Sequence, residues 1–225
     1  MKKILVLIII LISSNVFAHM DHYKKYNKIE MDIFRNGELI GYNYYFFTRK
    51  GDQTIITNQI KFSVKLLGAT IFQVEGYGEE KYLKDQLISY ESRTLQNDKK
   101  KFVNLTLNNK SKKFDIEGSS YNGEALNSNV VGNWWNHKIL QADTQISPIS
   151  GSVKNQVVTF IGKENIDLYG KTYNVDHFTL KSKDSSLPKD KKLDFHIWYD
   201  RKNAMIVKVS YSRMGNWEYR LKSFE

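Results

Sequence analysis

Side chains that could carry out catalysis are present in this sequence, but not at the spacings that catalytic motifs need. The chain has no cysteine, which excludes thiolate nucleophiles and thiolate-bound metals. It also lacks the Gly-x-Ser-x-Gly nucleophile turn, the phosphate-binding Gly-x-x-x-x-Gly-Lys loop and the dinucleotide-binding Gly-x-Gly-x-x-Gly turn. A carboxylate pair for glycoside cleavage is defined by distance in space, which a sequence does not give. We therefore expect a protein without catalytic activity and keep an uncharacterised enzyme as a third hypothesis.

Histidine supplies one hypothesis for metal binding. No His-x-His or His-Glu-x-x-His pattern occurs, so spacing predicts neither a metal site nor a cofactor. The histidines are His19, His22, His137, His177 and His196. If the chain is cleaved after Ala18, the free amine and imidazole of His19 could chelate copper, with His22, His177 or His196 completing the site. The alternative is that His19 and His22 are ordinary polar residues of a chain terminus.

The aromatic side chains supply a second hypothesis, which concerns ligand binding. The chain has 14 Tyr, 12 Phe and 4 Trp, which is more rings than the core of a small sheet needs. Trp134, Trp135 and Asn136 lie in an irregular stretch, where they could cover the mouth of a curved sheet as a lid or plug. They would then contribute to a site for an acyl chain or a hydrophobic peptide in the concave face. The alternative is that both tryptophans only pack against the open end of the core.

The elements that position these residues are expected to be β-strands. Apolar and polar residues alternate along many stretches, and turn signals such as Asn36-Gly37 separate them. Gly76 and Gly78 predict a β-bulge inside one strand. The ranges expected as strands are 29–34, 38–50, 54–67, 70–82, 87–95, 101–107, 113–118, 153–162, 165–169, 171–183, 193–199, 207–212 and 217–222.

Residues 119–152 lose this alternation and gather Asn, Gly and Ser. We expect a long connection with a short helix near residues 134–140, because a structureless loop of this length is unusual unless it covers something. Sequential strands joined by short turns predict an antiparallel meander with one apolar and one charged face. The predicted fold is therefore mainly β: a curved antiparallel sheet, forming a half-barrel or incomplete barrel, with a short helix or lid in the central connection.

The start of the chain has the pattern of a signal peptide, approximately residues 1–18. Two lysines precede the apolar run Ile4–Ile12, and Val16-Phe17-Ala18 fits cleavage after Ala18. The apolar run is about half as long as a permanent membrane helix needs to be; an uncleaved anchor is the alternative. We expect residues 19–225 to be exported to the periplasm, or secreted, as a single antiparallel β domain without a transmembrane anchor.

The chain carries a formal net charge of +10. For an exported protein this charge favours contact with anionic lipid head groups or cell-wall polymers over contact with nucleic acid. The basic runs Lys99–Lys101 and Lys191-Lys192 fall at expected turns, where lysines are usually solvated. We therefore expect no nucleic-acid partner. The expected partners are a lipid or other apolar ligand, or another envelope protein.

Several short motifs follow one another along the chain: Ile29-Glu30-Met31-Asp32-Ile33, Asn36-Gly37-Glu38-Leu39-Ile40-Gly41, Glu91-Ser92-Arg93-Thr94, Trp134-Trp135-Asn136, His196-Ile197-Trp198-Tyr199-Asp200 and Tyr219-Arg220-Leu221. In this order they resemble exported bacterial proteins from a domain family of unknown function. More distantly, the chain is similar to the curved sheets of lipoprotein carriers of the LolA/LolB type. The resemblance implies a half-barrel with an apolar concavity, and it assigns no catalytic residues.

These observations predict a non-catalytic protein of the bacterial envelope that binds a lipid or other apolar ligand in the concave face of its sheet. Trp134, Trp135 and Asn136 are the candidate ligand-binding residues. The second hypothesis is a structural or interaction module whose sheet edges or aromatic loop contact another envelope protein. A cleft with several polar residues of strongly shifted pKa would favour the enzyme instead.

Overall fold

A computed structural model describes residues 22–225 of the chain. They form a mainly β fold in which 15 strands make one open, largely antiparallel sheet, as the sequence predicts. The predicted signal peptide, its cleavage site and His19 lie outside the described residues. Within residues 22–225, no helix has the length and apolar character needed to cross a membrane.

The strands fall into two runs along the chain. The first run is β1 (Lys28–Arg35), β2 (Glu38–Lys50), β3 (Gln53–Leu66), β4 (Ala69–Leu83), β5 (Gln86–Gln96), β6 (Lys99–Asn108), β7 (Lys113–Gly118) and β8 (Tyr121–Leu126). The second run is β9 (Val130–Val131), β10 (Thr144–Ile146), β11 (Val153–Leu168), β12 (Lys171–Ser182), β13 (Asp194–Asp200), β14 (Met205–Ser212) and β15 (Asn216–Phe224). A single turn of 3-10 helix, η2 (His137–Leu140), lies between β9 and β10.

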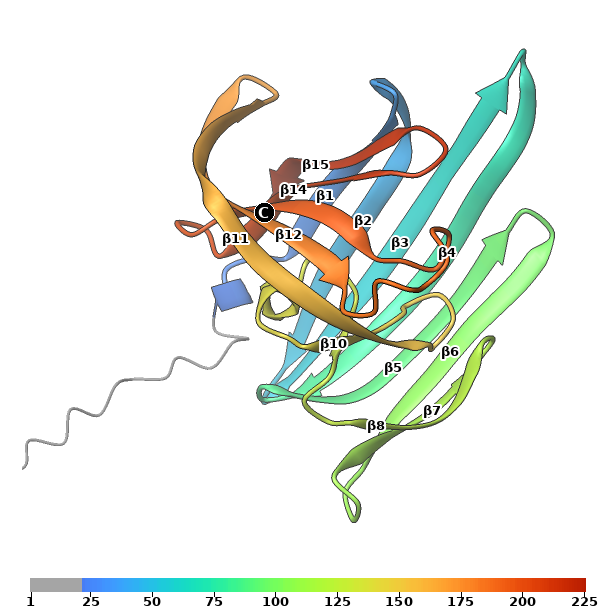
Figure 1. The fold of residues 1–225 in the computed structure, drawn as a ribbon. Helices are drawn as coiled ribbons and strands as arrows, with labels where there is room; N and C mark the ends of the chain where they lie inside the picture. The colour runs from blue at the N-terminus through green and yellow to red at the C-terminus, as the bar shows by residue number, and fades with distance from the viewer. Residues whose placement is uncertain (1–21) are drawn as a thin grey trace, which may run out of the picture.

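The two runs meet in the middle of the sheet. The strand order is β8-β7-β6-β5-β4-β3-β2-β1-β15-β14-β13-β12-β11-β10-β9, so β1 pairs with both β2 and β15. Neighbouring strands are antiparallel except β9 and β10, which are parallel. Only residues 127–129 connect β8 to β9, the two edges of the sheet. Because so short a link spans little distance, the sheet must curl until its edges approach each other, and Figure 1 shows the resulting barrel-like shape.

Most predicted strands are confirmed, and the differences lie where alternation is weak. The ranges 153–162 and 165–169 belong to one strand, β11. Inside the predicted irregular stretch the structure adds β8, β9 and β10; β8 buries only Ala125, and the other two are too short to show a pattern. The helix predicted near residues 134–140 is the four-residue η2, which begins only after its cap at Asn136.

The bulge predicted at Gly76 and Gly78 is wrong. Both glycines lie in regular pairing. The register shifts elsewhere: at Val64 and Lys65 of β3 in its pairing with β4, and at Lys81 and Tyr82 of β4 in its pairing with β5. The glycines provide space on the inner face. A Cβ on Gly76 would lie 3.0 Å from Cγ2 of Ile60, and one on Gly78 would lie 3.1 Å from the Tyr90 hydroxyl.

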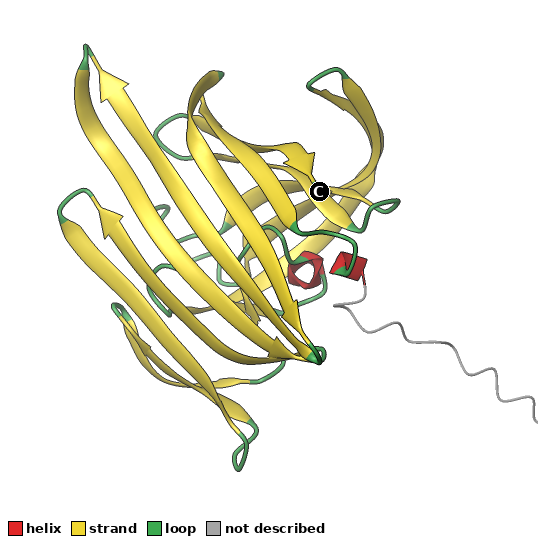
Figure 2. Ribbon diagram, turned by 180° about the vertical axis from the view of Figure 1, so that it is seen from behind, coloured by secondary structure: helices red, strands yellow, loops and turns green. Residues whose placement is uncertain are grey.

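The core fills the concave face of the sheet. Strand residues of one parity point inward. Residues 127–152, which we call the central segment, contribute Trp134, Trp135, Ile139 and Ile146 to the same core. Figure 2 shows the sheet wrapped around η2 and its neighbouring loops. The end of the central segment is fixed to β5, because Tyr90 and Ser92 both donate hydrogen bonds to the carbonyl of Pro148, at 3.0 and 2.7 Å. The part of the central segment around the tryptophans is thus an internal layer of the fold, whereas β9 and β10 continue the sheet.

Candidate functional site

Trp135, one of the three predicted ligand-binding residues, lies at the centre of the core. Its side chain is 0% exposed. Its ring lies edge-on to the rings of Tyr23, Phe47 and Tyr82, with centroids 5.0, 5.5 and 5.9 Å apart. These contacts come from the N-terminal residues, β2 and β4, so Trp135 joins three distant parts of the chain.

The other two predicted residues, Trp134 and Asn136, are also buried. Trp134 packs against Phe195 and Tyr219 on the opposite half of the sheet. The side chain of Asn136 accepts a hydrogen bond from the backbone of Lys138 and thereby caps η2. The structure brings all three together in the core; ligand binding by them stays a prediction.

A buried carboxylate holds the central segment against β4. Glu80 is 2% exposed. Nδ2 of Asn133 and Nε1 of Trp135 each donate to its Oε1 at 2.7 Å, and the Tyr82 hydroxyl donates to its Oε2 at 2.7 Å. Both oxygens are therefore occupied, and two of the three donors come from the central segment. Buried polar groups are stable only when paired in this way.

The electrostatics of this cluster follow from its burial. Burial raises the pKa of Glu80, and the hydrogen bonds from Trp135, Asn133 and Tyr82 act in the opposite direction. Burial and then the nearby Glu80 carboxylate raise the pKa of Tyr82 well above its usual value. The Tyr82 hydroxyl therefore keeps its proton and remains a donor to Glu80.

A second set of hydrogen bonds ties the central segment to β2 and β3. The hydroxyl of Tyr45 accepts hydrogen bonds from Nδ2 of Asn43 at 2.8 Å and from the backbone of Trp134 at 3.2 Å. Asn58 on β3 in turn donates to Asn43 at 2.6 Å. The backbone around the tryptophans is thus fixed as well as their rings.

A third set connects η2 to the N-terminal residues. The Tyr23 hydroxyl lies 2.6 Å from Nδ1 of His137 and accepts a hydrogen bond from the His137 backbone at 3.2 Å. Burial lowers the pKa of His137 to about 4, so the imidazole is neutral at pH 7 and Nδ1 can accept from Tyr23. Arg49 holds Tyr23 from the other side by donating to the carbonyls of Tyr23 and Tyr26.

This cluster can orient side chains, but it is not accessible to a substrate. General acid or base catalysis requires the catalytic group to reach the reacting atom. Glu80, Asn133, Trp135, Asn136 and His137 are each at most 8% exposed. The arrangement therefore supports a structural role in which the central segment is fixed inside the sheet.

Three ionisable side chains form a hydrogen-bonded chain on the outer face. Oε1 of Glu164 lies 3.0 Å from Nδ1 of His177, and Nε2 of His177 lies 2.8 Å from Nδ1 of His196. The ring of Trp198 stacks on His177, and its Nε1 donates to Glu164 at 2.6 Å. Burial is the main cause that lowers the pKa of His177.

The predicted copper site is not tested by the part of the chain that the structure describes, because that site needs His19. Within residues 22–225, no three His, Asp or Glu side chains are placed to hold a metal ion. His22 is exposed and lies with its ring 5.5 Å from that of His137, away from the His177–His196 pair. Copper binding at His19 and His22 stays a prediction, because His19 lies outside the described residues.

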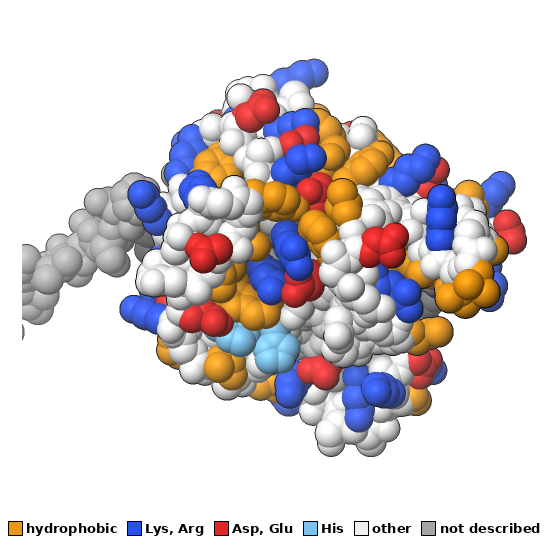
Figure 3. All heavy atoms as spheres, turned by 90° about the horizontal axis from the view of Figure 1, so that it is seen from above, with side chains coloured by type: hydrophobic (Ala, Val, Ile, Leu, Met, Phe, Trp, Pro, Cys, Tyr) orange, Lys and Arg blue, Asp and Glu red, His pale blue; other side chains and the backbone are white. Residues whose placement is uncertain are grey.

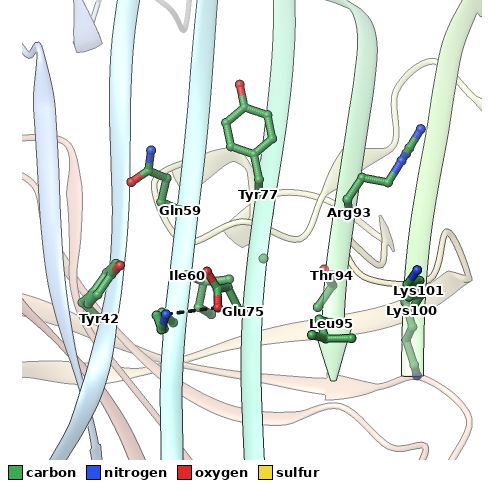
Figure 4. Close-up of a pocket in the computed structure, with 12 residues that line it drawn as sticks. Tyr42, Gln59, Ile60, Glu75, Tyr77, Arg93, Thr94, Leu95, Lys100 and Lys101 are labelled. Atoms are coloured by element: carbon green, nitrogen blue, oxygen red, sulfur yellow. Dashed lines mark ion pairs between the residues drawn. The ribbon is translucent and has the colours of Figure 1, made fainter. Parts of the chain in front are cut away.

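A groove of about 500 Å³ crosses the outer face from β2 to β6 (Figure 4). Figure 4 shows Gln59, Tyr77 and Arg93 in one row across the strands and Tyr42, Glu75 and Leu95 in the next. Their neighbours of opposite parity belong to the core, which places these side chains outside the barrel. Lys61 and Glu75 form an ion pair at 3.1 Å in this groove. The groove is shallow and mixes apolar with basic side chains.

Sequence reasoning missed Glu80, the centre of the buried cluster. One signal for it was present: Glu80 has the same parity as Val74 and Tyr82 in a strand whose even-numbered residues face inward. A carboxylate on the apolar face of a strand needs buried donors. Two of its three donors, Asn133 and Trp135, however, lie more than 50 residues away in the sequence.

Comparisons with known proteins agree with the fold. A family profile described as "Domain of unknown function (DUF6134)" matches residues 31–222. A crystal structure of a beta-barrel-like protein of the domain of unknown function DUF1849 from Brucella abortus is 9% identical, covers 88% of this chain and 96% of its own, and has a TM-score of 0.59. A DUF1329 family protein from Desulfovibrio piger is 11% identical, with coverages of 92% and 88%, and its TM-score of 0.19 carries no argument. A search of curated proteins finds no match.

Proposed function

The chain belongs to the family described as a domain of unknown function (DUF6134), and from this premise we propose that it is a non-catalytic interaction module of the cell envelope. The module contacts its partners through its outer face and its hairpin tips. The inner face of the sheet serves to hold the chain's own central segment.

The filled concave face is the observation that carries this proposal. An apolar ligand at the centre of the concave face would have to displace Trp135, which is fully buried there. Displacement would take the Trp135 and Asn133 donors away from Glu80. Each buried group left unpaired costs about 1–3 kcal/mol, in addition to the exposed ring. The polar contacts therefore favour a permanent internal layer over a mobile lid.

Further observations support a module without catalysis in the envelope. The sequence lacks the nucleophile and phosphate-binding motifs of common enzymes, and the buried carboxylate of Glu80 is out of reach of a substrate. The signal-peptide pattern of residues 1–18 supports export. The outer face carries charges of both signs, which suits contact with specific partners better than binding of a long polyanion.

Ligand binding in the concave face is the competing function, and mass spectrometry distinguishes the two. Protein recovered from cells that express the full chain is extracted with organic solvent, and the extract is analysed for acyl species. We expect none in stoichiometric amount. One acyl chain per protein molecule would overturn the proposal and support the concave-face ligand.

Trp135→Ala provides an independent test of the same point. The substitution removes a fully buried aromatic side chain, so we expect the unfolding free energy to fall by about 3–5 kcal/mol. Uptake of an apolar dye by the folded wild type should stay at background. If the wild type takes up dye at one site and Trp135→Ala abolishes uptake while remaining folded, the tryptophan belongs to a ligand site and the interaction module is wrong. Trp198→Ala, on the outer face, is the matched control.

A further inference from the structure

We propose that one end of the sheet docks on an anionic lipid surface, with Leu67 and Met214 as the inserted side chains. This inference rests on the proposed interaction module and names its partner. Leu67 and Met214 occupy the tips of the β3–β4 and β14–β15 hairpins, and they are 100% and 89% exposed. No other large apolar side chain of the described residues reaches such exposure.

The backbone at these two tips makes their exposure informative. Leu67 has φ 49° and Met214 has φ 52°, in the left-handed region that disfavours most side chains. Leu67-Gly68 has nearly the same pair of φ values as Asn36-Gly37, 49° and 83° against 51° and 83°. Asn or Gly is the residue that such a turn normally selects. A leucine in this backbone conformation is destabilising, and its side chain makes no contact within the chain that would offset the cost.

The other left-handed positions in the described residues show what the fold normally uses. Those outside glycine are Asn36, Lys84, Asn97, Lys112, Tyr169 and Ala204. The first four are polar. Tyr169 donates a hydrogen bond from its hydroxyl to Asp32 at 2.6 Å, and Ala204 is 9% exposed. Leu67 and Met214 are the two that expose a large apolar side chain without such a contact, which points to a partner outside the chain.

The two tips lie at the same end of the sheet. The β1–β2 turn lies between them in the strand order. Arg35 donates to the carbonyl of Met214, and Asn36 exchanges hydrogen bonds with Asn216, so the β14–β15 tip is fixed to that turn. Figure 1 shows the β3–β4 and β14–β15 tips on the same side of the molecule.

The β3–β4 hairpin also projects beyond its neighbours. Its pairing with β2 ends at Gly41–Phe62, and its pairing with β5 ends at Val74–Gln96. Residues 63–73 therefore extend as a two-stranded arm. Two more apolar side chains, Leu66 and Ile71, are 60% and 51% exposed near its tip. A projecting arm with an apolar tip can enter the interface of a bilayer while the sheet stays outside it.

Basic side chains accompany the apolar tips. Lys65 flanks Leu67, and Arg213 flanks Met214, where it donates to the backbone carbonyl of Asp190. Arg35 lies beside Met214 as well. Acidic residues also lie at this end: Glu38 and Asp98 at neighbouring turns, and Asp184 and Asp190 in the β12–β13 connection. Figure 3, seen from above, shows hydrophobic side chains next to Lys and Arg side chains, with Asp and Glu side chains between them. Apolar tips flanked by cations match an anionic lipid surface.

Vesicle flotation tests the inference. Protein recovered from cells expressing the full chain is mixed with phosphatidylcholine vesicles with or without phosphatidylglycerol. We expect binding to the anionic vesicles and weakening by added salt. The double variant Leu67→Asn, Met214→Asn should bind about 100-fold more weakly, since it removes two apolar side chains from the lipid. Because Asn suits the left-handed turn, this variant should melt no lower than the wild type.

The matched control is Leu83→Asn, which removes a half-exposed leucine at the β4–β5 turn, at the opposite end of the sheet. It should bind vesicles like the wild type. Absence of wild-type binding, equal binding to neutral vesicles, or an unchanged double variant would overturn the lipid partner, and the tips would then belong to a protein contact. None of these outcomes touches the interaction module itself, whose failure is the recovery of an acyl ligand from the interior.

Discussion

The neutral, buried state of His137 predicts a measurable dependence of stability on pH. Burial lowers the pKa of His137 to about 4, from an ordinary value of 6.5. Between these two values the unfolded chain binds a proton that the native protein does not bind. The unfolding free energy therefore rises with pH through this window. The contribution of His137 to it is lost as the pH falls from 6.5 towards 4. Above pH 6.5 the contribution is complete.

The size of the effect follows from the width of the window. A shift of one pKa unit corresponds to about 1.4 kcal/mol, so a window of about 2.5 units corresponds to about 3 kcal/mol. His137→Asn removes the titrating group and leaves a polar atom near the position of Nδ1, where it can still pair with Tyr23. The variant should lose about 3 kcal/mol less than the wild type between pH 7 and pH 4.

Urea denaturation followed by tryptophan fluorescence, at half-unit steps of pH, provides the assay. Gln59→Asn, an exposed substitution on the outer face that removes no titrating group, is the control and should follow the wild-type profile. If His137→Asn and the wild type lose stability in parallel between pH 6.5 and pH 4, then His137 is not held neutral by the fold, and the account of its contact with Tyr23 is wrong.

The remaining predictions concern Glu80 and one glycine. Because burial raises the pKa of Glu80, the contribution of this carboxyl group to the unfolding free energy is fully present below its ordinary pKa. The contribution is lost as the pH rises through the folded value, which is the reverse of the behaviour of His137. Glu80→Gln should therefore gain up to about 1.4 kcal/mol per pH unit relative to the wild type across that window, measured by the same denaturation series. The exposed Gln59→Asn variant removes no titrating group and should keep the wild-type profile, and equal profiles for both variants would contradict the buried charge. Gly41→Ala should destabilise the protein by about 1–3 kcal/mol, because the added Cβ would overlap the carbonyl of Lys61. Gly162→Ala is the control and should change the melting temperature little, because no atom lies within 4 Å of the added Cβ. Similar losses of stability in both variants would show that the close approach at Gly41 is absent.

The local features of this fold could be predicted because they depend on neighbouring residues. Alternation placed most strands and their inward faces, and Asn36-Gly37 specified a hairpin through φ values that these two residues tolerate. The curved, barrel-like sheet followed from sequential strands with one apolar face. Gly76 and Gly78 were misread, because a glycine that makes a bulge and one that makes room for Ile60 or Tyr90 look the same in a sequence.

The sequence by itself therefore determined a mainly β chain, its strand spans and the absence of common catalytic motifs. Only the tertiary structure decided that Trp135 fills the core and that Glu80 holds it there. Their contact joins β4 to the central segment across more than 50 residues, and it exists only because the sheet curls until β8 and β9 approach. Closure of that kind depends on the twist accumulated over 15 strands. This accumulated twist cannot be predicted from any single stretch of the sequence.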